Sequence, residues 1–130
     1  MHNAIHNFLL RMKTIRDFAA AINSHDLEKI AALMSDDHTF IDAHGNEMTG
    51  KETMKGGWGS YFQLFPDYYV EIEGIVTNAD LAVAYGYAGA GVGEKAWKIP
   101  AAWRAIAQDG KIKLWQVYAD TKIQLESVHG

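Results

Sequence analysis

Two hydrophobic patterns follow one another along this sequence, and their order constrains the fold more than any other feature. In residues 4–22 the apolar side chains recur at every third or fourth position, which predicts a long amphipathic helix. A second helical pattern covers residues 27–34, and a third, weakened by three glycines, covers residues 51–64. From residue 68 the pattern changes to the two-residue alternation of β-strands. Helices followed by a meander of strands predict an α+β fold.

Turn signals divide the second half of the chain into four long strands. We expect these strands at residues 68–76, 81–91, 96–107 and 111–120, after one short strand at residues 38–42. The pair Asp109-Gly110 is a strong signal for a two-residue hairpin turn, and residues 43–50 are expected to form a loop. Because the sequence contains no repeat, low-complexity tract or linker, a single domain over residues 1–130 is expected.

The composition excludes several classes of protein. The chain has 130 residues, of which 48% are hydrophobic, and this is enough to build a buried core. A net charge of −4 without a basic run argues against a nucleic-acid-binding surface. The absence of cysteine excludes disulfides, thiolate metal sites and a cysteine nucleophile. We find neither a signal peptide nor a stretch long enough to cross a membrane, so we expect a cytoplasmic protein without membrane contact.

The last two strands are substantially apolar on both faces. Because side chains alternate along a strand, Trp97 and Trp103 share one face, and Trp115 lies on one face of the following strand. Ala102 and Ile106 lie on the opposite face from Trp103. Since helices cover only one face of such a sheet, we expect the tryptophan face to pair with a second copy, which gives a homodimer.

Asp42 is the leading candidate for a catalytic group. It ends the short strand on the same face as His38 and Phe40. If it were buried in a cavity, loss of solvation would raise its pKa toward that of a usable general base. The alternative is a structural aspartate that accepts hydrogen bonds from the backbone amides of the following loop.

Two further charged residues complete the candidate catalytic set. Asp120 ends the last strand with Gln116 and Tyr118 on its face, where it could serve in acid–base chemistry, in a polar network or as a strand-end cap. Arg104 lies in an apolar strand and needs a partner, either a carboxylate such as Asp42 or a bound anion.

The sequence predicts neither a metal site nor a cofactor. His2 and His6 have helical spacing but lie at a terminus where fraying is expected, and the zinc-binding H-E-x-x-H motif and a Gly-rich phosphate loop are absent. His44 is a weak candidate for a dyad with Asp42. The aromatic residues are expected mostly in the core, with some lining a concavity.

The order of these elements, together with three motifs, resembles the SnoaL-like branch of the nuclear transport factor 2-like superfamily. The motifs are DFAAAINSHDLEKIAALMSDDHTFIDAHG, the FPD after the third helix and QDGKIKLWQVYAD, and the resemblance spans residues 15–121. It implies a cone-shaped fold in which a curved antiparallel or mixed sheet and three N-terminal helices enclose a pocket, commonly with a dimer across the other face. The same scaffold hosts cyclases, isomerases, hydrolases and non-catalytic binders, so it specifies the fold better than the reaction.

Ketosteroid isomerase offers the closest catalytic comparison within this superfamily. Its general-base aspartate lies in a segment similar to HTFIDAHG, which implies that Asp42 faces the pocket. Its two oxyanion donors fall at Phe18 and Ala102 and therefore do not carry over, although Arg104 on the same face as Ala102 offers a different electrophile. The ending WQVYAD is similar to that of limonene epoxide hydrolases and some polyketide cyclases, where Asp120 would occupy the place of a terminal-strand aspartate.

We therefore expect a cofactor-independent acid–base enzyme, such as an isomerase or aldol-type cyclase, for a small apolar carbonyl compound. Asp42 would abstract a proton while Arg104, Tyr85 or Tyr118 polarises the carbonyl. The alternative is a module that binds a small ligand without chemistry or serves as a dimeric scaffold. The side chains expected to line the pocket are those of His38, Phe18, Trp58, Tyr61, Phe62, Tyr85, Ala102 and Tyr118.

Overall fold

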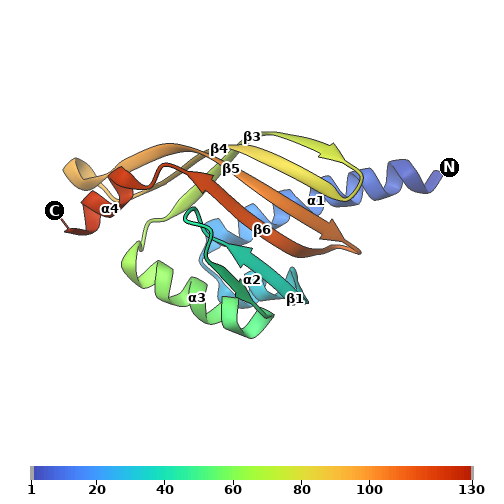
Figure 1. Cartoon of the computed structure of the whole chain (residues 1–130), viewed down its shortest axis with the longest axis horizontal. Coiled ribbons are helices and arrows are strands. Elements are labelled where there is room, and N and C mark those ends of the chain that lie inside the picture. Colours follow the sequence, from blue (N-terminus) through green and yellow to red (C-terminus); the bar gives the residue numbers. More distant parts are fainter. Residues whose placement is uncertain (1, 130) are drawn as a thin grey trace.

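The computed structural model describes residues 2–129, and the side chains of residues 4–127 (Figure 1). Its elements in chain order are α1 (His2–Ser24), α2 (Leu27–Ala32), β1 (Met34–Ile41), β2 (Glu47–Thr49), α3 (Lys51–Leu64), β3 (Tyr69–Asn78), β4 (Leu81–Ala90), the 3-10 turn η1 (Gly93–Lys95), β5 (Trp97–Gln108), β6 (Lys111–Ala119) and α4 (Lys122–His129). This arrangement confirms the predicted α+β class. None of the described helices is both long and apolar enough to cross a membrane.

The strands form one curved, open sheet in the order β2-β1-β6-β5-β4-β3. The pairing of β1 with β6 is parallel and every other pairing is antiparallel, so the sheet is mixed. Helices α1, α2 and α3 lie on one side of the sheet (Figure 1). The predicted cone of a bent sheet closed by three N-terminal helices is confirmed.

The face of the sheet that meets the helices carries the core, and we call it the inner face. Trp97, Trp103 and Trp115 lie on it with exposed fractions of 5%, 0% and 1%. Phe18 of α1 packs edge-on against Trp115, with 4.9 Å between the ring centroids. The prediction that these tryptophans form a dimer surface is therefore wrong, because the helices of the same chain already cover them.

The opposite face of the sheet, which we call the outer face, carries the strand residues Tyr85, Ala102 and Tyr118, which the sequence analysis placed in the pocket. Tyr85 and Tyr118 are both 48% exposed, and each pairs across the ladder with Ala102. The sequence analysis had exchanged the two faces. Lys98 and Arg104 share the outer face, and this greater polarity is the signal that could have decided the assignment.

Several element boundaries differ from the predicted ones. Strand β1 begins at Met34, which had been placed on the second helix, and Glu47–Thr49 form the short strand β2 within the predicted loop. Helix α3 forms despite its glycines, and Gly59 has a packing role. A Cβ there would lie 3.2 Å from Leu27 Cδ1, so the missing side chain lets α3 approach α2 closely.

Side chains at the C-terminal end of α1 and directly after it form hydrogen bonds with the free edge of β3 and the residue before it. Asn23 Nδ2 donates to the Val70 carbonyl at 2.9 Å, and Asn23 Oδ1 accepts from the Val70 amide at 2.7 Å. The imidazole of His25 lies 2.6 Å from the Tyr68 carbonyl oxygen. The amide of Asn23 therefore replaces one rung of a missing strand and fixes the end of α1 against the sheet.

Candidate functional site

A pocket of about 440 Å³ lies between the inner face of the sheet and helix α3. Its lining residues come from four regions: the end of β1 with the loop and strand after it, helix α3 and its C-terminal turn, the inner face of β4 to β6, and the first turn of α4. They are Phe40, Asp42, Ala43, His44, Met48, Met54, Gly57, Trp58, Tyr61, Leu64, Phe65, Tyr68, Ala88, Trp97, Ile99, Val117, Ala119, Thr121, Gln124 and Leu125.

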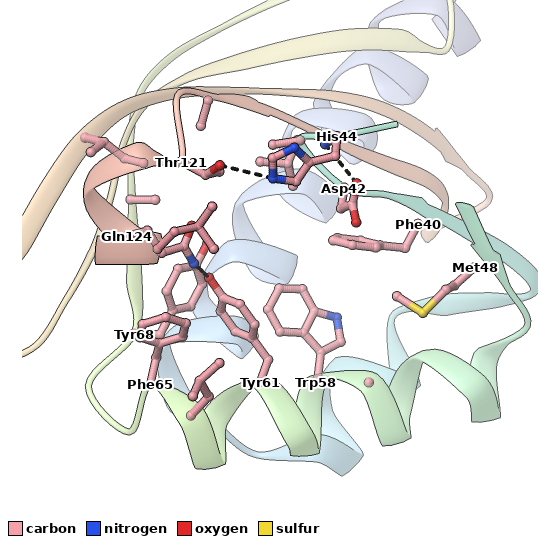
Figure 2. Close-up of a pocket in the computed structure, with 18 of the residues that line it drawn as sticks. Phe40, Asp42, His44, Met48, Trp58, Tyr61, Phe65, Tyr68, Thr121 and Gln124 are labelled. Carbon is pink, nitrogen blue, oxygen red and sulfur yellow. Dashed lines mark hydrogen bonds between the residues drawn. The ribbon is translucent and has the colours of Figure 1, made fainter. Parts of the chain in front are cut away.

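Aromatic rings form most of one wall of this pocket. Trp58, Tyr61 and Phe65 follow one another at helical spacing along α3 and its end, so their side chains project from one side (Figure 2). Tyr61 and Tyr68 meet edge to face with 4.9 Å between their centroids, and Phe65 meets Trp97 of β5 at 5.6 Å. Such mutually perpendicular packing holds the rings in place without filling the cavity.

The two pocket tyrosines are neutral phenols at physiological pH. Burial raises the pKa of Tyr61 and of Tyr68 far above the ordinary tyrosine value. The hydroxyl of Tyr61 accepts a hydrogen bond from Gln124 Nε2 of α4. These phenols are suited to hydrogen bonding with a ligand and unsuited to proton abstraction.

The polar end of the pocket lies across the cavity from α3 (Figure 2). There the Asp42 carboxylate accepts hydrogen bonds from the backbone amides of His44 and Asn46, both at 2.9 Å, and from Asn46 Nδ2 at 3.1 Å. Partial burial acts to raise the pKa of Asp42, but the hydrogen bonds from Asn46 and His44 outweigh it and hold the pKa below its ordinary value. Asp42 is therefore an ionised carboxylate with reduced basicity.

Two contacts join the C-terminal helix to the rest of the pocket. The imidazole Nε2 of His44 lies 3.1 Å from Thr121 Oγ1, and Gln124 bonds to Tyr61. Thr121, Gln124 and Leu125 thereby become one side of the pocket. Among the residues that the structure describes, no three His, Asp or Glu side chains are grouped as metal ligands.

The family model for the SnoaL-like domain matches residues 15–115. The chain belongs to the SnoaL-like domain family. No curated protein matches the sequence. The resemblance inferred from the sequence motifs is confirmed.

Solved structures share the fold at low sequence identity. A hypothetical protein with a ketosteroid isomerase-like fold from Catenulispora acidiphila DSM 44928, in complex with trimethylamine, is 20% identical with a TM-score of 0.80, covering 89% of this chain and 92% of its own. TerC co-crystallised with polyporic acid is 15% identical with a TM-score of 0.80, covering 93% and 99%. An LEH-like epoxide hydrolase from M. tuberculosis is 15% identical with a TM-score of 0.79, covering 93% and 90%.

The SnoaL-like domain brings only part of the predicted site to the pocket. Asp42, Trp58 and Tyr61 line it as expected. Asp120 does not line it, because its exposed carboxylate turns to the backbone amide of Lys122, 3.0 Å away, at the start of α4. That arrangement is the strand-end cap that the sequence left open as an alternative.

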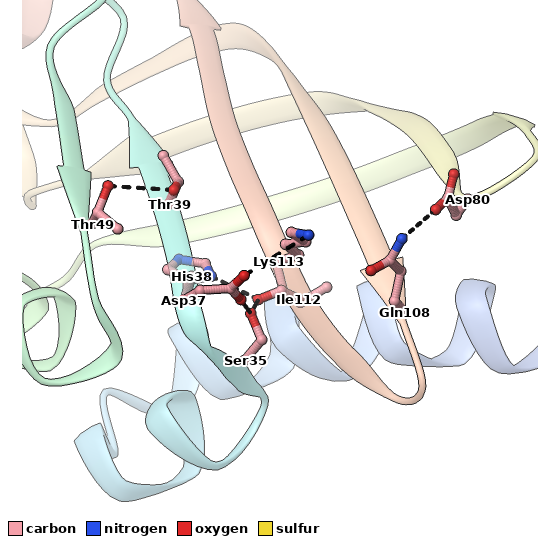
Figure 3. Close-up of polar contacts among 9 residues, drawn as sticks. All are labelled: Ser35, Asp37, His38, Thr39, Thr49, Asp80, Gln108, Ile112 and Lys113. Atoms are coloured by element: carbon pink, nitrogen blue, oxygen red, sulfur yellow. Dashed lines mark hydrogen bonds and ion pairs between the residues drawn. The ribbon is translucent and has the colours of Figure 1, made fainter.

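Three residues predicted to line the pocket are instead packed in the core beside it. Phe18 is fully buried against Trp115, and Phe62 stacks on the His25 ring with 3.9 Å between the centroids. His38 is also fully buried, and its Nδ1 bonds to the Ile112 carbonyl at 2.8 Å (Figure 3). Each of the three lies on the inner side of the sheet but is covered by neighbouring side chains. The periodicity of the sequence therefore did not distinguish a core position from a pocket position.

The groups expected to polarise a carbonyl are on the outer face. Arg104 Nε donates to Gln116 Oε1 at 3.1 Å, and Tyr85, Ala102 and Tyr118 lie on the same face of the sheet. Their predicted place in the pocket is corrected, because the sheet itself separates them from Asp42.

Several residues that line the pocket were not predicted from the sequence. Trp97, Val117 and Ala119 line the pocket from the face that had been assigned to the dimer. Phe65 follows Trp58 at a spacing of seven, which is a helical signal that could have been read. Gln124 belongs to α4, a helix that the sequence analysis did not predict, and Thr121 directly precedes it.

Proposed function

We propose that this SnoaL-like protein binds a small, largely apolar molecule in the pocket between α3 and the sheet. The observation that carries this proposal is a cavity of about 440 Å³ with an aromatic wall and a few polar groups at one end. Small-molecule sites commonly have volumes of roughly 300–1,000 Å³ and this kind of lining. Trimethylamine and polyporic acid, present in two solved structures of the same fold, add support.

A fluorescent probe and a pocket-filling variant test this function. N-phenyl-1-naphthylamine is neutral, becomes bright in apolar surroundings and is smaller than the cavity. We expect it to bind the wild-type protein and to lose at least tenfold in affinity in Ala119→Phe, because Ala119 lines the pocket.

The matched control is Ala102→Phe, the same substitution on the outer face of the neighbouring strand. It should leave probe affinity within about twofold of the wild type. Equal affinity in all three proteins would show that the probe does not use this pocket and would contradict the proposal.

Acid–base catalysis by an isomerase or cyclase is a second candidate, and one observation favours it. Asp42 and His44 both line the pocket, so a carboxylate and an imidazole are available to a bound substrate. The reduced basicity of Asp42 and the outer-face position of Arg104 favour binding without chemistry instead.

Exchange of α-protons separates these two functions. If Asp42 abstracts protons from carbon, the wild-type protein accelerates deuterium incorporation into 2-indanone in D2O, followed by proton NMR, and Asp42→Asn does not. Equal exchange with both proteins, at the rate of buffer alone, would remove the catalytic candidate and leave ligand binding.

We also propose that two copies associate through their outer faces. Tyr85 and Tyr118 leave nearly half of their surface exposed there, and both flank the small side chain of Ala102. A patch of exposed aromatic residues on a sheet face is typical of a protein interface.

A further inference from the structure

We infer that the pocket selects a positively charged amine with an apolar body, bound with its charge beside Asp42. This inference deepens the proposed binding function and rests on it. It is carried by the position of a single carboxylate at the polar end of a largely apolar and aromatic cavity.

Asp42 dominates the charge of the pocket. Among the described residues that line it, Asp42 is the only carboxylate, and neither lysine nor arginine is present. The two tyrosines stay protonated, so Asp42 supplies the fixed charge of the lining.

The carboxylate is held so that it retains capacity for a ligand. Among the described residues, one oxygen, Oδ1, accepts both backbone amides, whereas Oδ2 accepts only the side-chain amide of Asn46. An ionised carboxylate offers about four acceptor positions, so Oδ2 keeps capacity for contact with an ammonium group of a ligand. Figure 2 shows the Asp42 side chain turned toward Phe40, across the cavity from Trp58.

A ligand that fills the pocket displaces water from the Asp42 carboxylate, and the free-energy cost depends on the charge of the ligand. A neutral hydrocarbon removes water from the carboxylate and returns nothing, which is unfavourable for a charge that is already partly buried. An anion adds repulsion at close range. A cation replaces the lost water with a charge-assisted contact, so only this class of ligand both fills the cavity and compensates Asp42.

The aromatic residues next to Asp42 add to this selectivity. Phe40, on the same strand face, meets Trp58 edge to face with 5.9 Å between the centroids, and Trp58 meets Tyr61 in the same way at 6.0 Å. The electron-rich faces of such rings attract ammonium groups, with tryptophan the strongest. The carboxylate and the rings therefore favour the same ligand charge.

An isosteric pair of ligands tests the inference directly. Benzyltrimethylammonium and neopentylbenzene have nearly the same shape and differ in charge, and phenylacetate supplies the anion. Binding is measured at pH 8 through the fluorescence of Trp58 and Trp97, which line the pocket. We expect the wild-type protein to bind the cation at least tenfold more tightly than the neutral isostere, and phenylacetate most weakly.

The decisive variant is Asp42→Asn, because asparagine still accepts the amides of His44 and Asn46 and thus preserves the loop. We expect it to bind the neutral isostere as well as or better than the cation. Asp109→Asn is the matched control, since it removes an equal charge in the β5–β6 turn and should keep the wild-type preference. Thermal unfolding of both variants checks that they are folded.

The outcomes separate this inference from the function on which it rests. Binding of the neutral isostere as tightly as the cation by the wild-type protein would overturn the amine assignment and leave the binding function intact. A cation preference that survives in Asp42→Asn would also overturn it, because the charge would not be the cause. Failure of all three probes and of N-phenyl-1-naphthylamine would overturn the binding function itself.

Discussion

Asp42 shows how a few local donors determine what a carboxylate can do. Desolvation raises its pKa, but hydrogen bonds from two backbone amides and one side-chain amide have a larger effect, so the pKa is lowered overall. The loop thus keeps Asp42 charged at the edge of an apolar cavity. A carboxylate tuned in this way suits electrostatic binding better than proton abstraction.

Removing the side-chain donor should make this effect measurable. In Asn46→Ala the bond from Asn46 Nδ2 is lost while the backbone amide remains, so the pKa of Asp42 should rise toward the ordinary value of about 3.9. Because a lowered folded pKa stabilises the protein above the unfolded value, this stabilisation is lost as pH falls through the folded pKa, below about pH 4. Carboxyl NMR titration checks the shift, and an unchanged Asp42 midpoint would contradict it.

His38 also makes the folded protein less stable in acid, but for a different reason, because it is a buried base. Burial lowers its pKa despite the bond to Ile112 and the charge of Asp37, and its Nε2 has no hydrogen-bond partner among the described residues (Figure 3). The unfolded chain binds the proton more readily. The free energy of unfolding should therefore fall as pH drops below about 6.5, by up to about 1.4 kcal/mol per pH unit.

His38→Asn tests this expectation, because asparagine can still donate to Ile112 but does not ionise. Urea unfolding between pH 5 and 8 should show a flatter pH dependence for this variant than for the wild type. His6→Asn removes an exposed histidine of α1 and should change the slope little. Identical slopes for the wild type and His38→Asn would exclude His38 as the source.

At the scale of elements, two glycines have different structural roles, one in the sheet and one in helix α3. The pairing of β3 with β4 shifts register between Ile72 and Gly74, and a Cβ on Gly86 of β4 would collide with the backbone oxygen of Glu71. A Cβ on Gly56 of α3 would meet nothing within 4 Å. Gly86 is therefore required by the irregular pairing, whereas Gly56 only weakens its helix.

The same substitution at these two positions should have opposite effects. Gly86→Ala should lower the free energy of unfolding by about 3 kcal/mol or more, because backbone atoms cannot move aside as a side chain does. Gly56→Ala should raise it by about 0.5–1 kcal/mol. Denaturant unfolding compares the pair, and a tolerated Gly86→Ala would show that the strand pairing adjusts.

The elements also show where sequence reasoning succeeds and fails. Helix α1 and the four long strands were predictable because each carries a strong periodicity over many residues. Helix α4 was not, since eight residues form a marginal helix alone and this one is held by Thr121 and Gln124 contacts to distant residues. Alternation grouped Trp97 with Trp103 correctly but could not say which face meets the helices.

At the scale of the whole molecule, the exchanged faces altered the site more than any boundary error. Asp42 was placed near the pocket by the resemblance of its segment to ketosteroid isomerase, whereas Arg104, Tyr85 and Tyr118 depended on the face assignment and lie on the other side. The helices cover the inner face, so any partner of the sheet must meet the outer one. The position of the two tyrosines therefore fits the proposed association and does not fit chemistry in the pocket.

The outer-face dimer gives a prediction for the intact protein. We expect light scattering at micromolar concentration to give twice the monomer mass, and Tyr85→Lys with Tyr118→Lys to give the monomer, because two cations per face would oppose association. Ile5→Lys is the control, since Ile5 is 68% exposed on α1, away from the outer face. If Ile5→Lys gave the monomer and the tyrosine variant stayed dimeric, the interface would lie on α1 and not on the outer face. A monomeric wild type would exclude the dimer.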